Sequence, residues 1–119
     1  MNSRKIFFSA FIASIFVASL LLSSVVFSED GKVNISSPAN GATFNKTDNV
    51  ELMYDALPGP DGDHLHLNVD GKRVDVIHSL KGKTSVGMLN PGKHHICLAV
   101  NTKSHVPTGV EACIDVTSK

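Results

Sequence analysis

The sequence is poor in aromatic side chains and has no excess of positive charge. Of its 119 residues none is tryptophan and only one is tyrosine, and 11 Lys and Arg residues balance 11 Asp and Glu residues. Proteins that bind nucleic acid use a basic surface and aromatic rings on which bases stack. The sequence has no excess of basic residues and few aromatic residues, which argues against nucleic acid as a partner.

Motifs of common enzyme classes are also missing. No serine lies in a Gly-x-Ser-x-Gly nucleophile elbow, and neither a His-Glu-x-x-His motif nor a phosphate-binding glycine loop occurs. The segments Asp61–Asp63 and Asp70–Gly71 lack the spacing of an EF-hand, and turn chemistry explains them. We therefore expect neither enzymatic activity nor an organic cofactor.

Long apolar stretches are restricted to the N-terminus. Arg4 and Lys5 precede a run from Ile6 to Val26 that only a few serines interrupt. A short basic segment followed by apolar residues is typical of a secretory signal peptide. The alternative is an uncleaved anchor, because about 20 apolar residues can also span a bilayer. In that case the membrane would be a partner of the protein.

The end of this run has the small residues that a signal peptidase reads. Val26 and Ser28 occupy those positions, and two acidic residues follow at once. The sequence thus predicts a signal peptide over residues 1–28 and a single domain over residues 29–119, in a periplasmic or secreted protein. The domain is long enough for one modest hydrophobic core.

The pattern of apolar residues in this domain predicts an all-β fold. Apolar and polar residues alternate with a period of two in short runs, which Gly, Pro, Asn and Asp separate. Seven strands of this length suit a seven-stranded immunoglobulin-like Greek-key sandwich. The expected strands are residues 32–36, 49–55, 64–69, 72–77, 84–88, 94–100 and 110–117.

A tight turn sets the expected register of the third and fourth strands. Asp70–Gly71 favours a two-residue type I′ hairpin. Regular pairing from this turn places His66 opposite Asp75, and it directs His64 and His66 away from the core. We expect the Asp75 carboxylate to orient the His66 ring.

Cysteine occurs only at Cys97 and Cys113, which the alternation places on the outer face of the last two strands. Direct pairing of the two residues in a hairpin brings their side chains close enough for a bridge. An oxidising compartment makes a disulfide the expected state. In the alternative, a reduced pair together with His95 would bind a soft ion such as Cu(I).

The histidines suggest a metal site. His64 and His66 form a His-x-His pair, whose rings lie on one side of a strand about 6–7 Å apart. His95 on a neighbouring strand is the expected third ligand, and imidazole suits both Cu(II) and Zn(II). His105, at the tip of the last hairpin loop, is a further candidate. A polar sheet face without metal is the alternative.

Two other histidines have simpler explanations. His94 is in phase with inward-facing Ile96, so we expect its ring to form a hydrogen bond with a loop. His78 follows the fourth strand and is interpreted as a boundary residue.

Three segments resemble an uncharacterised family of small bacterial periplasmic proteins. They carry a Gly-x-His-x-His-Leu strand, a Pro-Gly-x-His strand start and a late His-x-Pro, in Gly62–Asp70, Leu89–Leu98 and His105–Pro107. The resemblance covers about half of the predicted domain. It implies an immunoglobulin-type sandwich in the bacterial envelope and no particular activity.

The resemblance also implies a set of functional histidines. By position these are His64, His66, His94 and His105, whereas His95 and the cysteine pair depart from the family pattern. A site of His64, His66 and His105, with His94 or His95 as a fourth ligand, fits both this set and the strand pattern. The sequence thus predicts an exported protein that binds a Cu or Zn ion, copper in particular. The alternative is an immunoglobulin-like module that binds another envelope protein.

Overall fold

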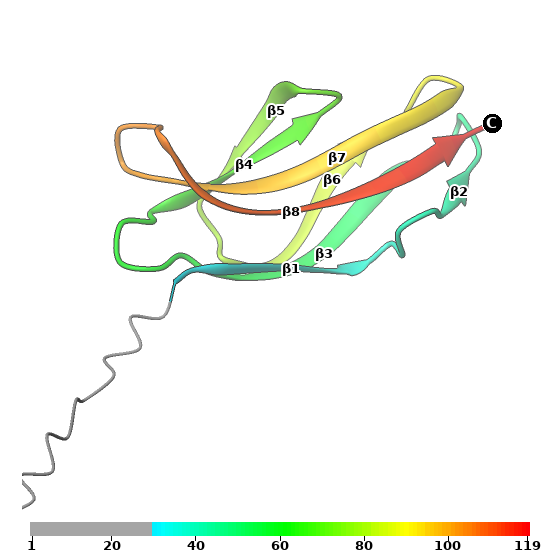
Figure 1. Cartoon of the computed structure of the whole chain (residues 1–119). Helices are drawn as coiled ribbons and strands as arrows, with labels where there is room; N and C mark the ends of the chain where they lie inside the picture. Colours follow the sequence, from blue (N-terminus) through cyan, green and yellow to red (C-terminus); the bar gives the residue numbers. More distant parts are fainter. Residues whose placement is uncertain (1–29) are drawn as a thin grey trace, which may run out of the picture.

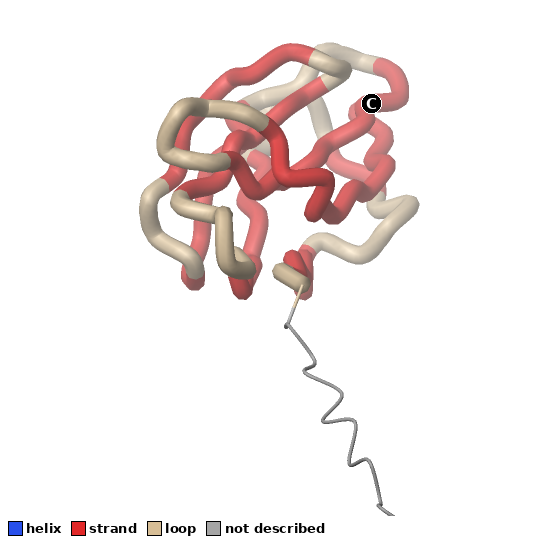
Figure 2. The backbone as a smooth tube through the Cα atoms, turned by 60° about the vertical axis from the view of Figure 1, so that its left-hand side comes forward, coloured by secondary structure: helices blue, strands red, loops and turns tan. Residues whose placement is uncertain are grey.

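The computed structural model describes residues 30–119, and the predicted signal peptide lies outside the described residues (Figure 1). Strands joined by short loops make up most of this part of the chain (Figure 2). In residues 30–119 we find no helix of the length and apolarity that a membrane crossing requires. The strands are β1 (Lys32–Ser37), β2 (Thr43–Phe44), β3 (Val50–Leu57), β4 (His64–Val69), β5 (Lys72–Ile77), β6 (Lys81–Gly87), β7 (Gly92–Asn101) and β8 (Pro107–Ser118).

The strands form two sheets that pack face to face. One sheet has the order β1-β3-β6 and the other the order β2-β8-β7-β4-β5, so they form the two layers visible in Figure 1. Alternate residues of each sheet fill the space between them, among them Leu52 of β3, Leu65 and Leu67 of β4 and Leu98 of β7, all fully buried. The predicted all-β sandwich is confirmed.

The number of strands differs from the prediction, because there are eight rather than seven. The additional strand is β2, in which Thr43 and Phe44 pair in parallel with Thr117 and Ser118 at the end of β8. Two residues are too few to show an alternating pattern, so the sequence gives no signal for this strand.

The hairpin of β4 and β5 has a different register from the predicted one. Val74 forms a β-bulge, and Asp75 therefore lies opposite Leu67 instead of His66. The Asp75 carboxylate accepts a hydrogen bond from the backbone N–H of Val76 (2.8 Å). The expectation that Asp75 orients His66 was thus wrong, because a single extra residue shifts every later pair.

The bulge has a second consequence at the far end of the hairpin. Leu65 now pairs with Ile77, and Ile77 turns into the core with 9% of its surface exposed, whereas Val74 is 54% exposed. The next position along the two strands sets His78 beside His64. Their ring centroids are 5.4 Å apart.

A disulfide joins the two longest strands. Cys97 of β7 lies directly opposite Cys113 of β8, with a Cα–Cα distance of 4.1 Å, and the two residues are bonded. β7 also pairs with β4, where Cys97 lies opposite Asn68. The bridge therefore lies on the same outer face of the larger sheet as His66, two residues further along β4.

A cluster of polar groups fixes the turn between β4 and β5 to β7. Asp70 accepts hydrogen bonds from the His95 backbone N–H (2.8 Å) and from His94 Nδ1 (2.7 Å). His94 Nε2 donates to the carbonyl of Asn90 (2.6 Å). The Asn90 carbonyl and the Asp70 carboxylate together raise the pKa of His94. The His95 N–H and the His94 ring lower the pKa of Asp70.

These pKa shifts predict how the Asp70→Asn variant depends on pH. The raised pKa of His94 gives a stabilisation that is full at low pH and is lost as pH rises through that pKa. The lowered pKa of Asp70 gives one that is lost only as pH falls through it. We expect the substitution to reduce the free energy of unfolding by about 0.5–1 kcal/mol at pH 6, because water screens the half-exposed carboxylate.

At pH 9 the loss should be smaller, because the stabilisation that comes from the raised pKa of His94 is lost as pH rises through that pKa. Asparagine tolerates the left-handed backbone of Asp70 (φ 52°), so the turn itself is preserved. Urea unfolding of both proteins at the two pH values measures the difference. Equal losses at pH 6 and pH 9 would show that the charged pair does not stabilise the turn.

The disulfide should make a large contribution to stability. It closes a loop between residues 16 positions apart, and such a loop is worth about 3 kcal/mol through the entropy of the unfolded chain. We expect a Cys97→Ala, Cys113→Ala double variant to lose about that much in urea unfolding. Reduction of the unaltered protein should give the same loss, and a loss below about 1 kcal/mol in both would refute this contribution.

Candidate metal centre

The His-x-His pair of β4 lies on the outer face of the larger sheet, yet it is buried. His64 lies opposite Asn101 and His66 opposite Ala99 on β7. The exposed fractions of His64 and His66 are 1% and 7%. Side chains on an outer sheet face are normally hydrated, so something must cover these two rings.

The cover is the loop between β7 and β8, residues 102–106. The Thr102 N–H donates to the carbonyl of Val106 (2.9 Å), and the His105 N–H donates to the carbonyl of Thr102 (2.9 Å). His105 has a left-handed backbone (φ 62°), which only a few non-glycine residues adopt. This tight loop directs the His105 ring back over β4, where its centroid lies 4.5 Å from that of His64.

Three ring nitrogens converge beneath the loop. His64 Nε2 lies 2.9 Å from His66 Nε2 and 3.3 Å from His105 Nδ1. His66 Nε2 and His105 Nδ1 are 3.1 Å apart. The structure therefore brings together three of the five predicted ligands, from β4 and from a loop about forty residues later.

Asp63 decides which nitrogen of His64 carries a proton. Its carboxylate lies 2.9 Å from His64 Nδ1, and because a carboxylate only accepts, Nδ1 must donate. In a neutral ring the opposite nitrogen, Nε2, then presents a lone pair to His66 and His105. At most two protons are left for three nitrogen contacts. A cation at the centre satisfies all three nitrogens at once.

The spacing of the nitrogens fits a single transition-metal ion. Two nitrogens bound to zinc at about 2.0–2.1 Å lie about 3.3–3.4 Å apart at a tetrahedral angle. At a right angle, as in tetragonal Cu(II), they lie about 2.9 Å apart at the same bond length. The observed distances of 2.9, 3.1 and 3.3 Å span this range. The three rings thus occupy one side of the ion and leave further positions open.

The charge states of His66 and Asp63 also favour metal binding by this cluster. Burial, and after it the charges of His64, Arg73 and His105, lower the pKa of His66. The ring is therefore neutral at pH 7, and its lone pair is available. The hydrogen bond from His64 lowers the pKa of Asp63, which stays ionised and holds the His64 ring in place. A carboxylate behind a ligand histidine also strengthens that ligand.

Two residues of this region were missed in the sequence. Asp63 is adjacent to His64, but its sequence context indicates only a turn. His78 was interpreted as a boundary residue, whereas a ligand atom of His78 lies within 4.8 Å of ligand atoms of Asp63 and His64. The bulge at Val74 brings His78 there, and its position could not be derived from regular pairing.

Two predicted ligands lie elsewhere. His94 is bound to Asp70 and Asn90, as its inward phase suggested, and His95 is exposed and donates to Asp115 (2.7 Å). His95 is four residues from Ala99 along β7, which is about 13 Å in a strand. Neither residue can serve as a fourth ligand beside His66 in this arrangement. The disulfide likewise occupies the sulfur atoms near His95.

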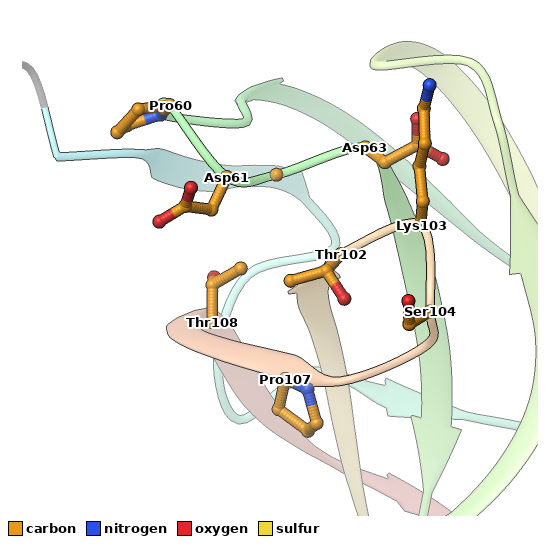
Figure 3. A pocket seen from close by; sticks show the side chains of 9 residues that line it. Pro60, Asp61, Asp63, Thr102, Lys103, Ser104, Pro107 and Thr108 are labelled. Carbon is orange, nitrogen blue, oxygen red and sulfur yellow. The ribbon is translucent and has the colours of Figure 1, made fainter.

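A hollow lies next to the cluster, between the loop before β4 and the loop that carries His105 (Figure 3). Its volume is about 600 Å³, and its lining carries both signs of charge: Asp61 and Asp63 come from the loop before β4, and Lys103 comes from the loop that carries His105 (Figure 3). The Asp63 side chain is 34% exposed. Water and ions therefore reach the Asp63 side of the cluster from solvent.

One buried oxygen in the same region has no partner. Asn101 lies opposite His64 and is 1% exposed, and its amide nitrogen donates to the Ala99 carbonyl. Its Oδ1 atom forms no hydrogen bond with any residue in the range 30–119. An unpaired buried acceptor is unfavourable, so this oxygen can accept from a water molecule or from a group bound near His64.

Comparison with known proteins identifies the fold but not the function. No known protein family matches the chain, and no curated protein matches it. The resemblance to small periplasmic proteins therefore stays a hypothesis.

Solved structures with a similar fold do exist. The fibronectin(III)-like modules of Clostridium thermocellum CbhA match with a TM-score of 0.59 and 10% identity, over 73% of this chain and 95% of theirs. An engineered protein matches with a TM-score of 0.52 and 16% identity, over 77% of this chain but only 21% of its own. At such low identities the likeness concerns the fold alone. The described domain is an immunoglobulin-like β-sandwich similar to fibronectin type III modules.

Proposed function

We propose that this protein is an exported metal-binding protein of the bacterial envelope, without enzymatic activity, and that it holds a copper ion on His64, His66 and His105. The observation that carries the proposal is the convergence of three ring nitrogens, 2.9–3.3 Å apart, in a covered site. Buried polar groups that cannot all satisfy one another are unfavourable without a ligand.

The donor set supports copper over zinc. Three imidazole nitrogens suit both ions, but sites of nitrogen ligands bind Cu(II) more tightly than Zn(II). The shortest nitrogen distance, between His64 and His66, corresponds to the right angle of a tetragonal Cu(II) site. The disulfide leaves no thiolate near His95 for a softer ion.

Export is supported by the cysteines as well as by the predicted signal peptide over residues 1–28. Cys97 and Cys113 are bonded, and structural disulfides persist in oxidising compartments such as the periplasm. Copper in such a compartment meets few competing thiols. The protein would then act as a carrier, scavenger or sensor of the ion.

The alternative function, strand addition to another envelope protein, has less support. Two of the four edge strands, β5 and β6, carry the charged residues Lys72, Arg73, Lys81 and Lys83. β5 also contains the bulge at Val74. Charges and bulges on edge strands oppose pairing with another chain.

Removal of one ligand should abolish tight copper binding. We expect His66→Ala and His105→Asn each to weaken Cu(II) binding by more than about 100-fold. Removal of a residue that only hydrogen-bonds to a metal ligand typically weakens binding by about 10–100-fold. Asparagine at position 105 keeps the left-handed backbone possible, so the effect reports the lost ring and not a rearranged loop. Competition titration against a chelator of known affinity measures the change.

The matched control is His95→Ala. This exposed histidine lies on the same sheet face but outside the cluster, so its removal should change the affinity by less than about threefold. Titrations with Zn(II) and Cu(I) should give weaker binding than Cu(II). If the His66 and His105 variants bind Cu(II) as tightly as the unaltered protein, the proposed site is wrong.

A further inference from the structure

The two nitrogens of His64 face two different groups of ligands. Nε2 points to His66 and His105, as described above. Nδ1 points the other way, to the Asp63 carboxylate at 2.9 Å. His78 lies near Asp63, since one ligand atom each of Asp63, His64 and His78 lies within 4.8 Å of the others. The ring centroids of His64 and His78 are 5.4 Å apart.

We propose that a second divalent ion, Cu(II) or Zn(II), binds to Asp63, His78 and Nδ1 of His64, so that the His64 ring bridges two metal ions. This inference rests on the proposed function, because the first ion occupies the opposite nitrogen of the same ring. Two imidazole nitrogens and a carboxylate oxygen are ligands that both ions accept.

Binding of the second ion displaces one proton from the His64 ring. The proton on His64 Nδ1, now donated to Asp63, leaves to solvent as the second ion binds. The ring then carries one negative charge and binds an ion through each nitrogen. The Asp63 carboxylate exchanges the hydrogen bond for a bond to the metal. No oxidant or reductant is needed.

Negative charges on the ligands offset the repulsion between two bound cations. Across an imidazole ring two ions lie about 6 Å apart, given bonds of about 2.0 Å to each nitrogen, and their repulsion must be offset. The deprotonated His64 ring and the Asp63 carboxylate supply two negative charges between and beside them.

The two ligand groups differ in accessibility, which suits sequential binding. His64 and His66 are buried, whereas His78 is exposed and the Asp63 side chain is 34% exposed. The second ion would therefore bind from solvent at the outer side of the His64 ring. In the competing arrangement Asp63 and His78 only support His64, and the protein binds a single ion.

The number of bound ions distinguishes these arrangements. The full chain, expressed with its leader and purified without an affinity tag, is stripped with a chelator and dialysed against excess Cu(II). We expect two copper ions per chain in the unaltered protein and one in His78→Gln. His95→Ala, which alters an exposed histidine elsewhere on the sheet, should retain two. His78 is exposed after the end of β5, so its replacement should leave the fold intact.

Electron paramagnetic resonance then tests the bridge. Two Cu(II) ions on one imidazole ring couple, so the doubly loaded protein should give far less than two spins per chain. His78→Gln should give one full spin from its single ion.

Each other outcome is decisive. One ion in both the unaltered protein and His78→Gln overturns the second site and leaves the proposed function standing. Two ions in His78→Gln, or two full uncoupled spins in the doubly loaded protein, overturn the bridge. No bound copper in any protein overturns the proposed function as well.

Discussion

The burial of two adjacent imidazole rings is the constraint on which the rest of the site depends. His64 and His66 are covered almost completely, although they lie on the outer face of a sheet. Buried ring nitrogens need partners, and here they meet one another, His105 and Asp63. Because the nitrogens lack enough protons to satisfy every contact, the cluster is better suited to a cation than to a closed hydrogen-bond network.

The sandwich supplies the rigidity that such a cluster requires. β4 lies between β5 and β7, and its alternate residues Leu65 and Leu67 are fixed in the core. β7 is in turn bonded to β8 through Cys97, so the loop that carries His105 leaves and returns on two strands that are covalently joined. Ligands on strands are held more precisely than ligands on mobile loops. The single loop ligand is His105, on the loop that covers the site.

Much of the fold could be derived from the sequence, because an alternation of apolar residues reports a half-buried strand directly. The same alternation placed His64, His66 and Cys97 on the outer face. It could not reveal the bulge at Val74, which depends on Ile77 fitting the core, nor the contribution of His78 that follows from it. The fold of the 102–106 loop over β4 depends on long-range packing, so the burial of the histidines had no local signal.

The central claim is that the three-histidine cluster holds copper in the cell. The most direct test is the metal content of the untagged protein, purified from its native envelope under metal-replete conditions and measured by elemental analysis. The account predicts at least one copper ion per chain. Protein that is correctly folded and disulfide-bonded but contains no metal would contradict it, and would favour a module that binds another protein.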